Sequence, residues 1–367
     1  MHISARRPWD DDFYRILKNT IPHLPTTHIF YYNHGGNDID GNKDILFFKD
    51  SLTVIFSLDL THYKTRQRII NEMESCNAKL WWIGTEPNAF NHPSIEVIWW
   101  GSEFMLQADQ YLKLDDIDKS PNKNSNHWIS LTLGPRHSRV YTAACLMHYG
   151  NLERGEMRIK THLAQEFNTL SMLVKNGCHW PTPPDIKLEP IYKRLLSQPW
   201  WGSQFFRWNT YNKLGHCNNA LNFDHYLRSL YSTTMVEVVN ETSIADEETG
   251  NPAPVFITEK FANSVHALHF PIMCSSAGTV EFLESLGFDM FRDTVDHSYD
   301  IVTDPTMRIH QAIRDNAILL NEYDTVYNLW NTNLPRLIAN RDHLRNMLST
   351  FTEINLNTVI NKINNIL

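Results

Sequence analysis

The sequence predicts an α/β protein built from two Rossmann-like domains, followed by C-terminal helices. Short apolar runs that read as strands alternate with stretches of helical periodicity over most of the chain. The length of 367 residues suits two domains, since one domain typically takes roughly 100–200 residues. The stretch 307–367 carries mostly helical periodicity, with an expected break near Pro335. We therefore expect an N-terminal domain over 1–125, a second domain over 126–310, and helices over 311–367 that pack back across both.

The N-terminal domain is predicted from short strands bounded by turns and from one clear helix. The helix covers 63–76 and follows from the spacing of its apolar residues. A polar segment at 115–126, with Pro121 and several asparagines, reads as the linker to the second domain. The strands are expected at 28–33, 45–48, 53–58, 79–83 and 95–100.

The second domain is predicted to start with a strand, a loop that holds two arginines, and a helix. The two arginines of this loop are Arg136 and Arg139. Residues 177–215 are rich in Pro and Trp and read as an irregular insertion. Strands are expected at 127–133, 235–240 and 271–273, and helices at 140–149, 223–231, 259–268 and 280–286.

Composition restricts the classes of function. The net charge is −8 and the basic clusters are short, whereas proteins that bind nucleic acid through its phosphates usually show a basic excess or stripe. The five cysteines include no CxxC pair, which fits free thiols in a reducing compartment. No apolar run reaches about 18 residues, so we expect no membrane span. The N-terminus lacks the apolar region of a signal peptide, and we expect a cytoplasmic protein of a bacterium or of an infected host.

The most informative stretch of the sequence lies between 236 and 304. Thr258 can cap a helix that begins near Glu259. A helix N-terminus presents free N–H groups and partial positive charge, which suits a diphosphate, and Lys260 adds a full charge in the same turn. Glu259 can accept hydrogen bonds from ribose hydroxyls. The small turn 275–278 follows a buried strand and would bring a second helix N-terminus to a ligand. The spacing alone also fits an ordinary capped surface helix.

This stretch resembles the donor-binding half of fucosyltransferase-like glycosyltransferases of the GT-B fold. Upstream, 131–146 with Arg139 is similar to the strand–arginine–helix entry into the C-terminal domain of that family. Over about 127–310, the resemblance implies a GT-B protein, in which two Rossmann-like domains face a central cleft and a sugar nucleotide is the donor. The motifs that carry it are Asn240-Glu241, Ile257-Thr258-Glu259-Lys260, the helix at 263–268, and Pro271-Ile272.

The resemblance also implies roles for individual residues. Arg139 and Lys260 would hold the donor diphosphate, and Glu259 would hold the ribose. Two cations at the leaving group would make a metal unnecessary. Asp38-Ile39-Asp40 matches the Asp-x-Asp pattern of a metal-binding motif but falls in a predicted N-terminal loop. The prediction requires that the guanidinium of Arg139 and the ammonium of Lys260 reach the same pyrophosphate.

Other residues of this half have both a functional and a structural interpretation. Arg136 is a second phosphate contact or a solvated loop charge, and Glu241 touches the sugar or ribose or is a strand-end surface residue. Ser276 and Gly278 belong to the small turn expected beside the donor. Tyr299-Asp300 either closes the cleft or forms a helix-capping turn.

An inverting reaction needs a base that deprotonates the acceptor hydroxyl, and we expect this base from the N-terminal domain. Glu86, in Gly84-Thr85-Glu86-Pro87 after a strand, is the preferred candidate. Asp59, after the strand that ends at Leu58, is the second, and His34 beside Gly35-Gly36 is a third option. Each carboxylate is otherwise a loop-end residue without a catalytic role.

The predicted function is a metal-independent, inverting transfer of a sugar from a nucleotide diphosphate to an acceptor hydroxyl on a glycan or lipid-linked saccharide. A UDP-sugar is slightly preferred over a GDP-sugar as the donor. One alternative is a phage-type enzyme that modifies a hydroxymethylated DNA base, with Lys64, Arg66 and Arg68 in a basic groove. Another is an inactive fold that only binds a sugar or nucleotide. Three tryptophan pairs either stack on sugars or bases or belong to the core: Trp81-Trp82, Trp99-Trp100 and Trp200-Trp201.

Overall fold

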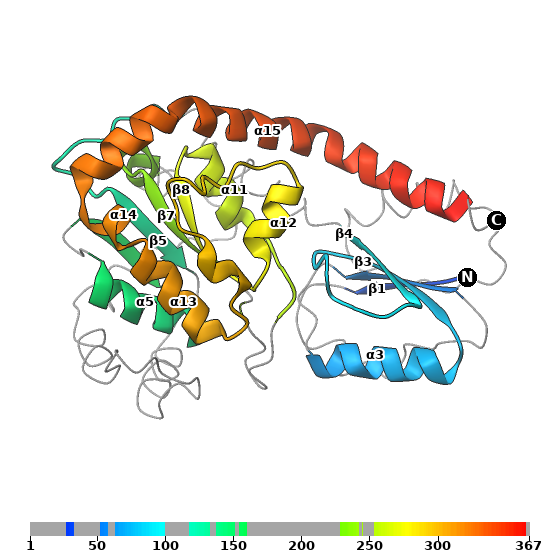
Figure 1. Ribbon diagram of the computed structural model, residues 1–367. Helices are drawn as coiled ribbons and strands as arrows, with labels where there is room; N and C mark the ends of the chain where they lie inside the picture. Colours follow the sequence, from blue (N-terminus) through cyan, green and yellow to red (C-terminus); the bar gives the residue numbers. More distant parts are fainter. Residues whose placement is uncertain are drawn as a thin grey trace, which may run out of the picture. The chain divides into compact units, whose positions relative to one another are not determined.

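The computed structural model is a mixed α/β protein with two parallel sheets (Figure 1). It divides into two compact units. The N-terminal unit holds Met1–Phe104, Pro254–Ile257 and Asn346–Leu367, and the C-terminal unit holds Met105–Ala253 and Thr258–Arg345. The structure describes residues 27–32, 52–57, 63–99, 117–132, 137–150, 154–159, 228–241, 244 and 253–364.

The sheet of the N-terminal unit has four parallel strands in the order β1-β2-β3-β4. The helix α3 (Tyr63–Ser75) lies between β2 and β3 in the chain. The strands coincide with four of the five expected for this half, and the fifth, 45–48, lies outside the described residues. Their bounds are β1 (Thr27–Tyr32), β2 (Leu52–Ser57), β3 (Lys79–Gly84) and β4 (Ile95–Trp99).

The core of this unit lies between α3 and β3. Ile69 and Met73 of α3 belong to one buried cluster with Leu80 and Trp82 of β3. The other face of β3 is buried as well, because Trp81 is almost wholly covered. A strand with both faces covered is typical of a parallel sheet. The pair Trp81-Trp82 is therefore core, whereas Trp100 and Trp200-Trp201 lie outside the described residues.

The sheet of the C-terminal unit has the order β6-β5-β7-β8, again all parallel. The connection from β5 through α5 (His137–Tyr149) leads to β6, on one side of β5. The connection from β7 through α11 (Glu259–His266) leads to β8, in the opposite direction. The strand order therefore reverses between β5 and β7. The strands are β5 (Trp128–Thr132), β6 (Gly155–Ile159), β7 (Val236–Asn240) and β8 (Phe270–Cys274).

Helices cover both faces of this second sheet (Figure 1). Right-handed crossovers that run in opposite directions place their helices on opposite faces. The helix α13 (Pro305–Asp315) packs against α5 and β8, whereas α11 packs against β7 and β8. The described residues of this unit also form shorter helices: α12 (Thr279–Ser285), the 3-10 helix η2 (Ser298–Ile301) and α14 (Ala317–Asn321). Among the described residues, no helix is both long and apolar enough to cross a membrane.

The last helix, α15, corrects one expectation from the sequence. It runs unbroken from Tyr323 to Asn364, over 42 residues, with Pro335 inside it, whereas the sequence predicted a break there. A proline removes one backbone donor and disfavours a helix interior. Side chains on both sides of Pro335 make specific contacts to the rest of the unit, and we attribute the continuity of the helix to them.

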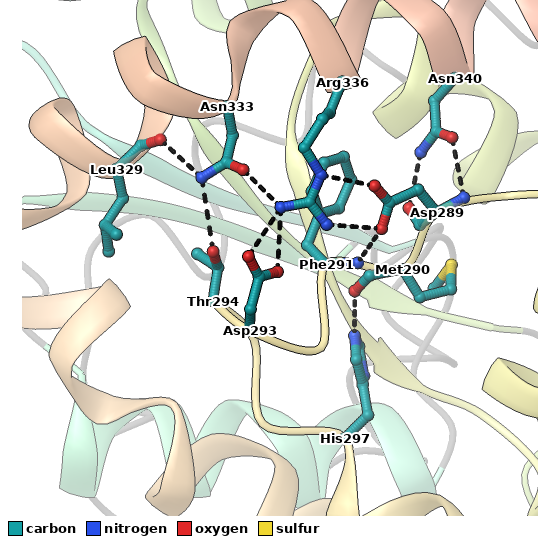
Figure 2. Close-up of polar contacts among 10 residues, drawn as sticks. All are labelled: Asp289, Met290, Phe291, Asp293, Thr294, His297, Leu329, Asn333, Arg336 and Asn340. Carbon is teal, nitrogen blue, oxygen red and sulfur yellow. Dashed lines mark hydrogen bonds and ion pairs between the residues drawn. The ribbon is translucent and has the colours of Figure 1, made fainter.

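These contacts hold the loop that follows α12 (Figure 2). Arg336 donates from Nε and Nη2 to the two carboxylate oxygens of Asp289, at 2.6 and 2.9 Å, and from Nη1 to Asp293. Its guanidinium also lies over the Phe291 ring, 5.0 Å from the centroid. Asn340 bonds the backbone N–H and C=O of Asp289, at 2.9 and 2.7 Å. Arg336 and Asn340 of α15 thus bind side chains and backbone groups of this loop at several successive positions.

Two residues of α15 also contact segments whose backbone lies in the left-handed region. Leu268 has φ 57° and Phe291 has φ 56°, a conformation that is uncommon outside glycine and asparagine. The indole N–H of Trp330 donates to the carbonyl of Leu268 at 2.8 Å, and Arg336 covers Phe291. The specific partners on α15 therefore offset the cost of these two conformations.

Replacing Arg336 with Met should lower the free energy of unfolding by about 1–3 kcal/mol, because the loop carboxylates lose a bidentate partner. Arg345→Met is the control, since Arg345 pairs along its own helix with the exposed Asp342 at 3.1 Å, and such exposed pairs contribute about 0.3–0.5 kcal/mol. Urea denaturation of the two variants measures the difference. Equal losses would show that the loop contacts of Arg336 add nothing.

Candidate functional site

The candidate site lies at the carboxyl ends of β5 and β7, where the strand order reverses. In open α/β sheets, ligands bind in the crevice outside the strand ends at such a switch point. Arg139 lies in the first turn of α5, which follows β5, and Lys260 lies in the first turn of α11, which follows β7. The two predicted phosphate ligands thus come from the two helices that flank the reversal. They approach it from opposite faces of the sheet.

Arg139 lies on a buried side of α5. Thr142, one turn further along α5, is fully buried, and its hydroxyl donates to the Ser138 carbonyl at 3.0 Å. Residues three apart share one side of a helix, so Arg139 lies on this side, one turn nearer the carboxyl edge. Its side chain is buried, with only 4% of the residue exposed. The sequence alone could not fix this orientation, because helix α5 is apolar on most sides.

A compact polar network fixes the start of α11. Glu241 follows β7 directly and accepts from Thr258, from the backbone N–H at 3.1 Å and from the hydroxyl at 2.6 Å. The Thr258 oxygen in turn accepts from the backbone N–H of Lys260 at 3.4 Å and from its ammonium at 2.9 Å. Thr258 is therefore the N-cap residue, as the sequence predicted. One hydroxyl links the end of β7, the helix start and the lysine.

The charge around Lys260 is balanced by acidic residues. Its Nζ lies 3.8 Å from Oε2 of Glu241 and 3.7 Å from Oε1 of Glu259. Glu241 is fully buried, and burial raises the pKa of its carboxyl while the charge of Lys260 lowers it. Both oxygens of Glu241 bond Thr258, so in this structure Glu241 positions the helix start. The side chain of Glu259 is 31% exposed and is the more open of the two carboxylates.

The turn with Ser276 and Gly278 follows β8, as expected, but its surroundings differ from the expectation. The carboxylate of Asp300 accepts from the backbone N–H of Val280 and of Glu281, both at 3.1 Å. The start of α12 is thus occupied by an internal anion, which an incoming phosphate would have to displace. Gly278, at φ 78°, remains open, since a Cβ built there meets no heavy atom of the described chain within 4 Å.

Tyr299, next to Asp300, is also held by hydrogen bonds to residues of the same unit. It is buried, accepts from the backbone N–H of Met273 at 2.9 Å, and donates to Nδ1 of His297 at 2.8 Å. Nε2 of His297 donates to the Met290 carbonyl at 2.8 Å (Figure 2). Of the two interpretations from the sequence, the structure shows the helix-capping turn for Tyr299-Asp300.

Arg308 of α13 was missed by the sequence analysis. It is 1% exposed and donates to the carbonyls of Ser275 at 2.8 Å and of Ile244 at 2.9 Å. These carbonyls belong to the loops after β8 and after β7. An arginine in a helix is usually a solvated charge, so nothing in the local sequence signals its burial.

A second polar cluster lies in the core on the same strand, β7. The buried Glu237 accepts from the Tyr231 hydroxyl at 3.3 Å and bonds Nδ1 of His269 at 3.2 Å. His269 also bonds Thr234 at 3.0 Å, and Lys119 donates to the Tyr231 and Thr234 carbonyls. Burial raises the pKa of Glu237 to about 8 and holds the pKa of Lys119 and of His269 well below their ordinary values. The cluster therefore favours neutral forms of these groups.

The predicted base of the N-terminal unit is buried as well. Glu86 is 1% exposed and lies 3.8 Å from Nη1 of Arg66, in the first turn of α3. Arg66 thus points inward, and Arg68 pairs with Glu72 at 3.8 Å. The described residues give no support to a basic groove made by these two arginines. The other predicted residues that lie outside the described ranges are Asp59, Arg136, His34, Asp38 and Asp40.

The pKa of Glu237 gives a test of this cluster. Between about pH 4.5 and about pH 8, the native chain keeps a proton on Glu237 that the unfolded chain loses. Stability therefore falls as the pH rises through this window, by up to about 1.4 kcal/mol per pH unit. In Glu237→Gln this loss is absent, so its unfolding free energy, relative to wild type, should rise from pH 5 to pH 8.

Urea denaturation at pH 5, 6, 7 and 8 would measure this difference. Glu72→Gln serves as the control for the amide substitution, because the side chain of Glu72 is 43% exposed. A flat difference for Glu237→Gln would show that Glu237 is already ionised in the native protein at pH 5.

Within the described residues, no group of three or more His, Cys, Asp or Glu side chains is placed to hold a metal ion. Comparison with known proteins yields no relative: no protein-family model, curated protein or solved structure matches the chain. Function must therefore be argued from the residues and geometry of this chain.

Proposed function

We propose that the chain is a glycosyltransferase that binds a sugar nucleotide at the switch point of its C-terminal unit. One observation carries the proposal: Arg139 and Lys260 occupy the first turns of the two helices that flank the reversal between β5 and β7. Helix starts offer partial positive charge, and each here adds a full positive charge. A diphosphate is the ligand that this combination suits best.

The proposed chemistry places these charges on the leaving group. The acceptor oxygen attacks the anomeric carbon, the bond from that carbon to the phosphate oxygen breaks, and the nucleoside diphosphate leaves with the electron pair. Arg139 can bind phosphate oxygens in pairs and Lys260 as a point charge. Both stabilise the negative charge that develops as the bond breaks. Glu259, the more open carboxylate, accepts from the ribose hydroxyls.

The acidic neighbours of Lys260 must leave it free to attract an anion. Both oxygens of Glu241 accept from Thr258, and burial raises the pKa of this carboxyl while Lys260 lowers it. The ammonium of Lys260 lies closer to the Thr258 hydroxyl, at 2.9 Å, than to the carboxylates of Glu241 and Glu259, at 3.8 and 3.7 Å. In this proposal the ammonium exchanges the Thr258 hydroxyl for a phosphate oxygen when the donor binds.

The base is proposed to come from the N-terminal unit. Glu86 is the described candidate, and the neighbouring Arg66 favours its ionised form, which a base requires. Asp59 is the second candidate. The acceptor is proposed to be a glycan rather than a DNA base, because Arg66 is buried and Arg68 pairs with Glu72 instead of forming a basic groove.

A thermal-shift screen over UDP-sugars, GDP-sugars and their free nucleotides tests the binding step. A donor at about 100 times its Kd should stabilise the wild type by about 2.7 kcal/mol, and the melting temperature should rise accordingly. Lys260→Ala and Arg139→Ala should each lose most of this rise, because each removes one cation from the diphosphate. A UDP-sugar is expected to give the largest rise.

Lys123→Ala is the matched control. Lys123 is a well-exposed lysine of the same unit that pairs with Asp324 at 2.6 Å, and its removal should leave the ligand-induced rise unchanged. The proposal is wrong if no nucleotide or sugar nucleotide stabilises the wild type. Incubation with the stabilising donor then separates an enzyme from a binding module: release of nucleoside diphosphate, alone or with an oligosaccharide or hydroxymethylated DNA, requires catalysis.

A further inference from the structure

A single buried arginine connects the loops at the candidate site. Arg308, on α13, donates from Nε to the carbonyl of Ser275 at 2.8 Å and from Nη2 to that of Ile244 at 2.9 Å. Its Nη1 donates to the carbonyls of Val302 at 2.5 Å and Thr303 at 3.1 Å. One planar group thus joins three segments that are far apart in the chain.

Each of the three segments belongs to the surroundings of the site. Ile244 lies three residues beyond Glu241, in the loop between β7 and α11. Ser275 opens the turn that carries Ser276 and Gly278. The 302–303 segment directly follows η2, whose Asp300 caps α12. A shift of the guanidinium would therefore move all three segments at once.

The chemistry of these bonds requires an arginine. These four partners are backbone carbonyls, which only accept hydrogen bonds, so every bond needs a donor on the side chain. Burial lowers the pKa of Arg308 to about 10, and the group still carries its charge and all its N–H donors at neutral pH. A lysine ammonium offers three donors from one point and cannot span the same set of carbonyls.

We propose that Arg308 is a positioning residue for the nucleotide-binding site. It holds the loops after β7 and β8 in the arrangement that binds the nucleotide. This proposal rests on the proposed function. In this proposal, Arg308 touches neither the donor nor the reacting atoms, but the nucleotide affinity depends on it. The nucleotide affinity should therefore fall when Arg308 changes, beyond what loss of stability explains.

The experiment compares Arg308→Lys and Arg308→Gln with Arg336→Met. Arg336→Met also removes contacts that stabilise the C-terminal unit, but these contacts hold the loop bonded to α15 (Figure 2) and not the loops bonded to Arg308. It therefore controls for destabilisation. Calorimetric titration with UDP and GDP, below the melting transition of the weakest variant, gives the affinities. Hydrogen exchange read by mass spectrometry reports on peptides that contain Glu241–Ile244 and Ser275–Glu281, with no ligand needed.

The expected result is faster exchange in both peptides and at least about tenfold weaker nucleotide binding in both Arg308 variants, since small displacements of binding groups are costly. Arg336→Met should keep the wild-type affinity. Affinity within about twofold of wild type in a folded Arg308→Lys would overturn the proposal, as would unchanged exchange in the two loop peptides.

Two further outcomes are also informative. If wild type binds no nucleotide, the proposed function fails, and positioning of the loops is then decided by exchange alone. If neither Arg308 variant folds, ¹⁵N NMR of the wild type still decides: the Nε–H signal of Arg308 should be slow to exchange and should shift on nucleotide binding. A signal that nucleotide leaves unmoved would contradict the proposal.

Discussion

The reversal of strand order between β5 and β7 limits where a ligand can meet the C-terminal unit. Because the crossovers leave in opposite directions, the two helix starts stand on opposite faces of the sheet and flank the carboxyl ends of β5 and β7. Everything proposed for Arg139 and Lys260 follows from this placement. Without the reversal, both helices would cover one face, and their first turns would not flank a common opening.

Several buried polar groups of this unit are bonded within the protein. Glu241, Arg308, Glu237 and His269 are buried and Lys119 is partly buried, and each finds partners among backbone or side-chain groups. Such networks stabilise only when they are satisfied, and they define one arrangement sharply. They also explain why loops at the strand ends can be held in place without regular secondary structure. Burying these polar groups costs free energy, but their hydrogen bonds hold the loops of the unit in defined positions.

Much of the fold could be predicted because its signals are local. The strands at β3, β5, β7 and β8 are apolar runs, and Thr258 before Glu259-Lys260 is a recognisable helix start. The strand β6 was missed, since its sequence, Gly-Glu-Met-Arg-Ile, is half polar. The continuity of α15 across Pro335 was also missed, because it depends on contacts with loops more than forty residues away in sequence, such as that of Arg336 with Asp289.

Features of the candidate site also divide into those with a local sequence signal and those that depend on long-range contacts. The residue types at the helix starts are visible in the sequence, but strand order decides that the helices of Arg139 and Lys260 flank one switch point, and strand order is a long-range property. Whether a polar side chain faces the ligand or the core is equally non-local. Glu241 was expected at the sugar or ribose or on the surface, yet it is fully buried against Thr258. Asp300 reaches the start of α12 only through its tertiary placement.

The shared helix α15 has a practical consequence for dissecting the protein. Neither compact unit is one continuous stretch of chain, and the division at Arg345 and Asn346 falls inside α15. A recombinant fragment cut at that point would end in mid-helix. A fragment that stopped before Tyr323 would expose the surfaces now covered by Trp330 and Arg336. Excised halves are therefore poor stand-ins, and biochemical work is best done with all of α15 retained.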